Sequence, residues 1–184
     1  DSIKNHLSII RDVATALMYM HEEKKMLHLD LKPGNIMRRH GDGHIFLIDF
    51  GLSKHYSSDG QPETSTSIGL GTAGYAPIEQ ANQMKSGEFR PTIDVYALGA
   101  TLLYMLTGKN PVRASDMSQK YIINALPDDV SEKCSSLLIN ALKKSEDERM
   151  ASMDGFKGQQ YDSSYSSYER NSTRKLTDKI KKDG

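Results

Sequence analysis

The sequence has a single cysteine, Cys134, no excess of charge of either sign and no long apolar run. A single cysteine excludes an internal disulfide and is typical of a reducing compartment, so we expect a cytoplasmic protein. The 24 lysines and arginines balance the 24 aspartates and glutamates, which argues against a dedicated binder of nucleic acid or of a membrane surface. The most apolar stretch, 95–106, is too short and too mixed to span a bilayer, so we expect no membrane segment.

The 184 residues are enough for one domain with its own hydrophobic core. The composition changes after Phe156, where aliphatic residues become rare and serines frequent. This pattern predicts a domain over residues 1–156 and a disordered or weakly helical tail over 157–184. The first residues carry charges throughout and match no signal peptide, and the chain does not begin with Met, so we expect it to be a fragment of a longer protein.

Hydrophobic periodicity predicts a mainly helical domain. At the N-terminus apolar residues recur at steps of three and four, with Ser2 as the candidate N-cap. The stretch DVYALGATLLYML is apolar nearly all round, which is typical of a buried helix, and Gly108 follows it as a stop signal. Cys134 lies on the apolar face of a later helix and is expected in the core. Helices are predicted over 2–22, 94–106, 116–126 and 131–144, with a short one from about Ser152.

One β-hairpin is predicted between the first two long helices. HIFLID, residues 44–49, is short, apolar and rich in β-branched and aromatic residues, as strands are. RRHGDG before it is a turn sequence, so we expect 36–38 to pair with 45–48. Residues 51–75 are rich in Gly, Ser and Thr without a sustained period, which predicts a long loop. Loops of that length in compact domains are often functional.

The polar residues of LHLDLKPGNIM, residues 27–37, are of the types that phosphoryl transfer requires. Asp30 could accept a proton from a hydroxyl group, Lys32 could neutralise charge on a transferred group, and Asn35 offers a neutral oxygen to a hard cation. Asp49, at the other end of the predicted hairpin, supplies the carboxylate that Mg²⁺ prefers. Phosphoryl transfer needs this combination of positioning and charge neutralisation. An isolated Asp beside a Pro-Gly turn is more often a turn former, so the cluster alone leaves a polar loop as the alternative.

Five motifs in family order make the chain similar to the C-terminal lobe of a protein kinase. HLDLKPGNIM resembles the catalytic loop H-R-D-x-x-x-x-N, and DFG at 49–51 matches the magnesium-binding motif. GTAGYAPIEQ (71–80) resembles the end of the activation segment, DVYALG (94–99) the start of the central helix, and EDERMAS (146–152) the late arginine motif. The resemblance covers roughly residues 3–156. It implies a mainly α fold with a small β-hairpin, the C-lobe of the α+β kinase family.

The resemblance implies a role for each polar residue of the site. Asp30 would be the catalytic base, and Lys32 would contact the γ-phosphate of ATP. Asn35 and Asp49 would bind Mg²⁺, and Met37 would lie beneath the adenine. ATP and Mg²⁺ are therefore the expected cofactors. The expected acceptor is a protein serine or threonine hydroxyl, because a lysine two residues after the catalytic aspartate resembles the serine/threonine branch.

The resemblance also implies a set of residues that support the site: His28, Phe50, Gly51, Thr72, Glu79, Asp94 and Arg149. Glu79 and Arg149 would form a buried ion pair joining the activation segment to the last helices. Asp94 would accept hydrogen bonds from the catalytic-loop backbone. Taken without the family, Glu79 and Arg149 could be unrelated surface charges and Asp94 a helix N-cap.

Two further expectations concern contacts of the catalytic loop. By the resemblance, Thr72 would hold Asp30 and Lys32 and shape the loop on the substrate side, and His28 would pack beneath Phe50 rather than act as a general base. His21, by contrast, is expected only to end the first helix.

Two departures from the family pattern concern regulation and completeness. Leu29 stands where the family has an arginine that pairs with a phosphate on the activation loop, a charge-assisted contact that leucine cannot make. Ser65, Thr66 and Ser67 are nevertheless candidate phosphorylation sites, in a stretch that could equally be an ordinary flexible loop. We expect the glycine-rich loop, strand lysine and helix glutamate of the N-terminal lobe to be missing from this chain, so the isolated chain is expected to hold half a nucleotide site and to have little activity.

The sequence leaves three functions open. The leading one is ATP-dependent phosphorylation of protein serine or threonine hydroxyls by a longer kinase that contains this chain. The second is a non-catalytic module, either a pseudokinase or a C-lobe that binds partners. The third is a small-molecule kinase of the aminoglycoside or choline type, but Lys32, the DFG motif, Glu79 and Arg149 favour the protein-kinase branch. The expected partners are a protein substrate and ATP, with no nucleic acid.

Overall fold

The computed structural model describes residues 3–55, 71–80 and 89–157. Several sequence predictions lie outside these residues: the N-cap Ser2, the candidate phosphosites Ser65, Thr66 and Ser67, and the tail from residue 158 onward.

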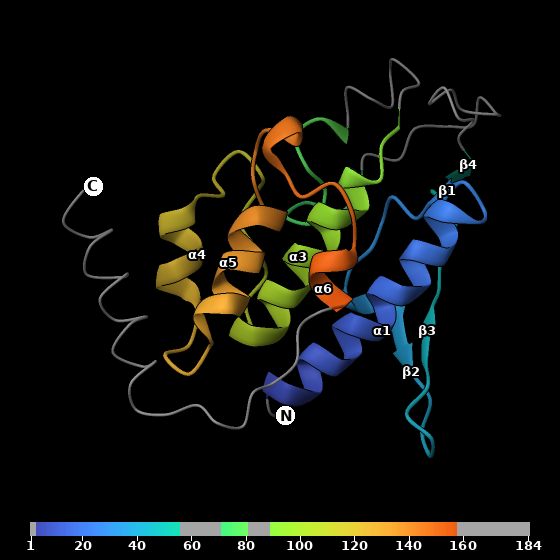
Figure 1. Cartoon of the computed structure of the whole chain (residues 1–184), viewed down its shortest axis with the longest axis horizontal. Helices are drawn as coiled ribbons and strands as arrows, with labels where there is room; N and C mark the ends of the chain where they lie inside the picture. Colours follow the sequence, from blue (N-terminus) through green and yellow to red (C-terminus); the bar gives the residue numbers. More distant parts are fainter. Residues whose placement is uncertain (1–2, 56–70, 81–88, 158–184) are drawn as a thin grey trace.

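Two long helices form the centre of the fold (Figure 1). α1 (Ile3–Glu22) is amphipathic, and its buried stripe runs from Leu7 to His21. α3 (Thr92–Thr107) packs against it and is buried on nearly every side, so the prediction of an interior helix is confirmed. Gly108 ends α3 in the left-handed conformation (φ 67°) and donates its N–H to Tyr104 O, because glycine has no Cβ to clash there.

The other helices complete the core around α3 (Figure 1). α5 (Glu132–Ala141) packs directly against α3, α4 (Gln119–Ala125) packs against α5, and the short α6 (Asp154–Lys157) packs against α1. A Cβ on Gly99 would lie 2.9 Å from Ala141 Cβ, so a glycine in α3 permits this close approach. Cys134 faces the core, as predicted, with 1% of its surface exposed.

Both C-terminal helices are shorter than their predicted ranges, 116–126 and 131–144. α4 begins only at Gln119 because the Ser118 hydroxyl caps it, accepting the Tyr121 N–H at 3.1 Å. The preceding residues form a turn instead, in which Met117 N–H reaches Arg113 O at 3.1 Å. A similar cap at Ser131 sets the start of α5, in agreement with the preference of serine for this position.

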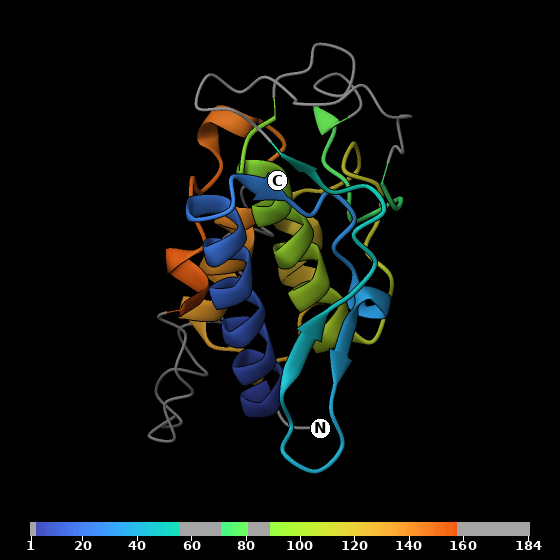
Figure 2. The ribbon, with the colours of Figure 1, turned by 90° about the vertical axis from the view of Figure 1, so that its right-hand side faces the viewer.

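β2 (Ile36–Arg38) and β3 (Ile45–Leu47) form the predicted hairpin, with Ile36 opposite Leu47 and Met37 opposite Phe46. The hairpin lies beside α1, and its turn extends past the helices (Figure 2). It follows a single 3-10 turn, η1 (Pro33–Asn35), in the middle of the catalytic loop.

A second two-stranded sheet was not predicted. β1 (Met26–Leu27) pairs antiparallel with β4 (Lys54–His55). Strands of two residues show no alternation of apolar and polar residues, and β4 lies in a stretch that was predicted to be loop. The predicted fold class, mainly α with a small β-hairpin, is confirmed. Within the described ranges, none of the helices has the length and apolarity needed to cross a membrane.

Candidate active site

Asp30, Lys32 and Thr72 form a closed triangle of hydrogen bonds. Lys32 Nζ donates to Asp30 Oδ2 at 2.9 Å and to Thr72 Oγ1 at 2.8 Å, and Thr72 Oγ1 donates to Asp30 Oδ1 at 2.7 Å. The Asp30 side chain is 12% exposed and that of Lys32 is 30% exposed. Both oxygens of a nearly buried carboxylate are thus fixed in direction, by one residue of the same loop and one that lies 42 positions later.

Asn35 also holds the loop that contains Asp30. Its amide Nδ2 donates to Asp30 O at 2.8 Å and more weakly to Asp30 Oδ2 at 3.4 Å. The side chain is buried, as part of η1, where Pro33 fixes the first residue of the turn. Because the nitrogen is engaged in this way, the carbonyl oxygen Oδ1 is the atom that Asn35 can offer to a cation.

Asn35 and Asp49 lie at the same end of the hairpin. Ile48 N–H donates to Asn35 O at 3.0 Å, which places the residue before Asp49 directly against Asn35. Asp49 itself is exposed and has a left-handed backbone (φ 60°), and Gly51 N–H donates to its Oδ1 at 3.3 Å. A carboxylate and a neutral amide oxygen from residues at the same end of the hairpin are oxygen donors of the kind that suits a hard cation such as Mg²⁺.

His28 contacts Phe50 through its ring, with centroids 5.2 Å apart and planes tilted by 46°. His28 is fully buried, and neither ring nitrogen has a hydrogen-bond partner among the described residues. Phe50 is 46% exposed and Met37 is 54% exposed. Met37 and Phe46 are cross-strand partners, so their side chains share one apolar face of the hairpin.

Asp94, near the start of α3, accepts hydrogen bonds from the catalytic-loop backbone. Its Oδ2 takes the His28 N–H at 2.8 Å, and its Oδ1 takes the Leu29 N–H at 2.9 Å. Burial alone would raise the pKa of this fully buried carboxyl, but the bond and charge from His21 and the two backbone donors outweigh it and lower the pKa. The geometry goes beyond an N-cap, since the partners lie 65 and 66 positions away.

His21 is a residue whose contact the sequence prediction missed. Its Nε2 lies 2.8 Å from Asp94 Oδ2, whereas we had expected His21 only to end α1. A signal was present, because His21 continues the buried stripe of Leu17 and Met20 in α1. A histidine on a buried stripe needs a polar partner, although the sequence alone does not say which one.

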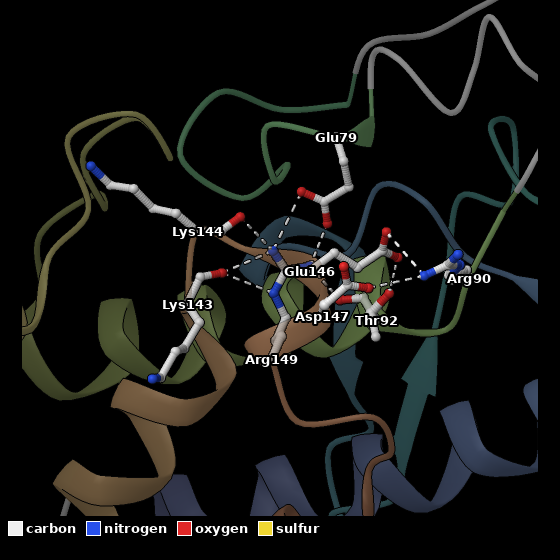
Figure 3. A network of polar contacts seen from close by, with 8 residues as sticks. All are labelled: Glu79, Arg90, Thr92, Lys143, Lys144, Glu146, Asp147 and Arg149. Carbon is white, nitrogen blue, oxygen red and sulfur yellow. Dashed lines mark hydrogen bonds and ion pairs between the residues drawn. The ribbon is translucent and has the colours of Figure 1, made fainter.

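Glu79 and Arg149 form the ion pair that the motifs implied (Figure 3). Arg149 Nη1 bonds Glu79 Oε1, and Nη2 lies 3.4 Å from Oε2. The arginine side chain is fully buried and the glutamate side chain is 17% exposed. The guanidinium also donates to Lys143 O at 2.9 Å and 3.1 Å and to Thr92 O at 3.1 Å. One cation thus joins the activation segment, α3 and the residues after α5.

A second layer of charges continues this network toward the surface (Figure 3). The Thr92 hydroxyl donates to Glu146 Oε1, in η2 (Glu146–Glu148). Arg90 lies 3.7 Å from Glu146 Oε2 and 3.4 Å from Asp147 Oδ1. The exposed fraction rises from 15% at Glu146 to 54% at Arg90 and 88% at Asp147, so these outer pairs contribute little to stability.

The end of the activation segment lies against the loop after α3. Gly74 has φ 87°, and a Cβ there would stand 2.6 Å from Pro111 O, so no other residue fits this approach. Tyr75 is buried and its hydroxyl donates to Asn110 Oδ1 at 3.2 Å. Burial raises the pKa of Tyr75 to about 12, which keeps the hydroxyl protonated as a donor.

GLGTAG, residues 69–74, has the letters of the glycine-rich pattern that we had expected to be absent. Its described residues do not form a phosphate loop that opens a helix: Thr72 O accepts the N–H groups of Tyr75 and Ala76 in a turn, and its hydroxyl binds Asp30. The letter pattern alone is therefore misleading here, because the motif requires a strand before it and a helix after it.

The comparison with known families identifies this fold. The model of the protein kinase domain matches residues 2–161. The chain belongs to the protein kinase domain family.

Curated relatives include serine/threonine-protein kinase PknA of Nostoc sp., which is 42% identical over 113 residues, covering 56% of this chain and 19% of the relative. Serine/threonine-protein kinase B of Synechocystis sp. is 39% identical over 126 residues, covering 64% of this chain and 20% of the relative. The chain therefore spans about a fifth of the length of these relatives.

Among solved structures, the kinase PK-1 of the Cydia pomonella granulovirus is similar in fold, with a TM-score of 0.61. The sequence identity is 22%, and the match covers 84% of this chain and 57% of the viral one.

Proposed function

We propose that the chain is the catalytic C-lobe of a longer kinase that phosphorylates protein serine or threonine hydroxyls with ATP. The observation that carries the proposal is the Asp30–Lys32–Thr72 triangle, in which residues of two segments fix both oxygens of one carboxylate. The division into a domain of residues 1–156 and a tail of residues 157–184, and a cytoplasmic location, belong to the same proposal.

In this proposal Asp30 acts as the base. Its carboxylate would accept the proton of the substrate hydroxyl while the oxygen of that hydroxyl attacks the γ-phosphorus of ATP; the bond from this phosphorus to the β,γ-bridging oxygen breaks, and ADP leaves. Lys32 Nζ, which already contacts Asp30, is near enough to neutralise charge on the phosphoryl group. Thr72 keeps the carboxylate and the ammonium in register.

Asn35 and Asp49 would hold Mg²⁺ through oxygen atoms, and Met37 would face the adenine with its exposed side chain. The ion, when bound, would offset negative charge on the phosphate oxygens. The residues of the chain do the positioning: Asn35 is fixed by its bond to Asp30 O, and Asp49 is fixed by the Gly51 N–H. Asp30, Asn35 and Asp49 all being present favours a catalytic role over a pseudokinase.

The serine/threonine branch is supported by two features. Lys32 bonds Thr72 directly, which links the lysine of the catalytic loop to the Gly-Thr of the activation segment. The relatives named above are described as serine/threonine kinases. A small-molecule kinase is disfavoured because the chain has the Glu79–Arg149 pair that anchors a protein-kinase activation segment.

The test is phosphate transfer by the complete protein, with Mg-ATP and a mixture of serine- and threonine-containing proteins. Asp30→Asn keeps the shape of the side chain and removes the base, and we expect kcat to fall by roughly 10²–10⁴-fold. Asp49→Ala should abolish Mg-dependent nucleotide binding. The matched controls are Asp42→Asn and Asp42→Ala, at the exposed tip of the hairpin. Full transfer by the Asp30→Asn variant would contradict the proposal.

We also propose that activity does not depend on position 29 binding a loop phosphate. Leu29 is 2% exposed and packs with Leu27, Phe89 and Ile93, and half-buried Leu52 adjoins this cluster. Treatment of the complete protein with a phosphatase should leave its activity unchanged. If dephosphorylation of residues 57–67 abolished activity, this part of the proposal would fail while the catalytic assignment would stand.

A further inference from the structure

Leu29, the residue before Asp30, has an unusual backbone. Its φ is 66°, in the left-handed region, although it is not a glycine. Such a conformation is unfavourable for a leucine and persists only where its surroundings enforce it. The direction of the Asp30 carboxylate depends on this backbone, because the two residues are joined by one peptide bond.

Each backbone N–H and C=O group of His28 and Leu29 forms a hydrogen bond with a side chain. Asp94 accepts both N–H groups. Ser53 Oγ donates to His28 O at 3.3 Å, and Gln80 Nε2 donates to Leu29 O at 2.8 Å. Ser53 and Gln80 come from the two described ends of the activation segment, and Asp94 comes from α3. Gln80 is therefore the hydrogen-bond donor to the Leu29 carbonyl.

The position of Gln80 is tightly defined. Its side chain is 1% exposed, and a Cβ on Gly71 would lie 2.8 Å from Gln80 Nε2 and 3.3 Å from Leu29 O. Gly71 is itself left-handed (φ 70°). The beginning and the end of the described segment 71–80 thus meet at the Leu29 carbonyl, where there is room for the amide of Gln80 and for little else.

We propose that Gln80 is a positioning residue for Asp30, acting through its hydrogen bond to the Leu29 carbonyl. The proposal deepens the proposed function and rests on it. The hydrogen bond from Gln80 to Leu29 O is direct and involves no charged group. Through it, the end of the activation segment holds Leu29 in its left-handed conformation, one residue before Asp30. When this end is displaced, Leu29 loses the donor to its buried carbonyl, and the backbone that aims Asp30 is free to relax.

The test compares three substitutions in the complete protein. Gln80→Met keeps the length of the side chain and removes the donor, and we expect a roughly 10–100-fold lower kcat, since small misplacements at a site cost that much. KM for Mg-ATP should change less than about twofold, because the Gln80 side chain bonds Leu29 O and not a residue assigned to nucleotide binding. The matched control is Gln119→Met, the same change at the exposed first residue of α4.

Gln80→Glu provides a rescue that a purely structural role would not show. A neutral carboxyl donates its O–H to the Leu29 carbonyl, whereas a carboxylate repels it. The ratio of the kcat of Gln80→Glu to that of wild type should therefore rise as the pH falls. The same ratio for Gln80→Met should not change with pH. A ratio for Gln80→Glu that does not change with pH would overturn the proposal.

Hydrogen exchange of the peptide covering 27–35 provides a measurement that does not need activity. In Gln80→Met this peptide should exchange at least about threefold faster, while Tm falls by only a few degrees because one neutral hydrogen bond is lost. Unchanged exchange would overturn the inference, and so would faster exchange together with a wild-type kcat. If the wild-type protein transferred no phosphate, the proposed function would fall, and the exchange result would still decide whether Gln80 holds the loop.

Discussion

Glu79 and Gln80 are neighbours in the chain, but they anchor the end of the activation segment in opposite ways. Glu79 forms an ion pair with the buried guanidinium of Arg149 and so joins the C-terminal helices. Gln80 donates a neutral hydrogen bond to the carbonyl of Leu29, the residue before Asp30. One anchor is a charged pair with the C-terminal region, and the other is an uncharged bond to the residue before Asp30.

The charged and the neutral contact differ in what they contribute. A buried charge is costly to leave alone, so the Glu79–Arg149 pair makes a broken anchor very unfavourable. A neutral amide bond has a smaller net value, about 0.5–1.5 kcal/mol, but it is directional and adds no charge beside the Asp30 carboxylate. The charged anchor therefore serves stability, and the neutral one serves geometry.

The largest effect should come from breaking the charged anchor. Arg149→Met removes the donors to Glu79, Thr92 O and Lys143 O and leaves a largely buried carboxylate unpaired. We expect the free energy of unfolding to fall by about 3–5 kcal/mol. Urea unfolding of the complete protein measures this. The double variant Arg149→Met with Glu79→Gln should recover part of the loss, and no recovery would show that the bonds to the carbonyls, not the pair, provide the stability.

Asp94→Asn should have the next largest effect, because it removes a charge that binds the same dipeptide as Gln80. Hydrogen bonds to charged groups contribute about 1.5–3 kcal/mol, and Asp94 accepts them from His21, His28 and Leu29. Asparagine keeps one oxygen, so we expect a loss of about 2–3 kcal/mol near neutral pH.

The pH dependence of this loss follows from the sign of the shift. The pKa of Asp94 is lowered from 3.8 on folding, so its contribution is present above that value and disappears as the pH falls through the folded pKa. The difference in unfolding free energy between wild type and Asp94→Asn should be constant near neutrality and shrink in acid. A difference that grew on acidification would contradict the assignment.

These contacts also show how far the sequence could lead. The interior helix α3 and the β2–β3 hairpin were predicted because apolar runs and a Gly-rich turn are local signals. Asp30, Asn35 and Asp49 could be named as candidates because motifs fix their spacing, and the structure brings all three to one end of the hairpin.

Contacts between distant segments could be predicted where the family motifs implied them, as for Glu79 and Arg149, but not where neither partner's contact belongs to a motif. Gln80 and Leu29 are 51 positions apart, and His21 and Asp94 are 73 apart. No periodicity connects such pairs, and the choice of partner depends on how whole elements pack. The two-residue strands β1 and β4 were missed for a related reason, since they exist only because the packing brings them together.

Leu29→Ala tests the residue that the neutral anchor, Gln80, binds, and it should lower the free energy of unfolding moderately. The side chain is buried in a small cluster with Leu27, Phe89 and Ile93. Truncation of a buried leucine costs about 2–5 kcal/mol, and we expect a value near 2 because the cluster is small. The hydrogen bond from Gln80 reaches the backbone, so kcat should fall less than in Gln80→Met. A larger fall in kcat than for Gln80→Met would show that packing, not the amide, aims Asp30.

The smallest effect is expected where charge is present without burial. Arg39 and Asp42 pair at the tip of the hairpin, with side chains 55% and 52% exposed. Arg39 and the His44 N–H lower the pKa of Asp42 to about 2, yet water screens the pair. Asp42→Asn should therefore leave the urea midpoint unchanged within error, at low salt and at high salt alike. A clearly lower urea midpoint for Asp42→Asn would mean that an ion pair stabilises this protein even when it is exposed. The greater stability expected from the Glu79 anchor than from the Gln80 anchor would then follow from charge alone, without burial.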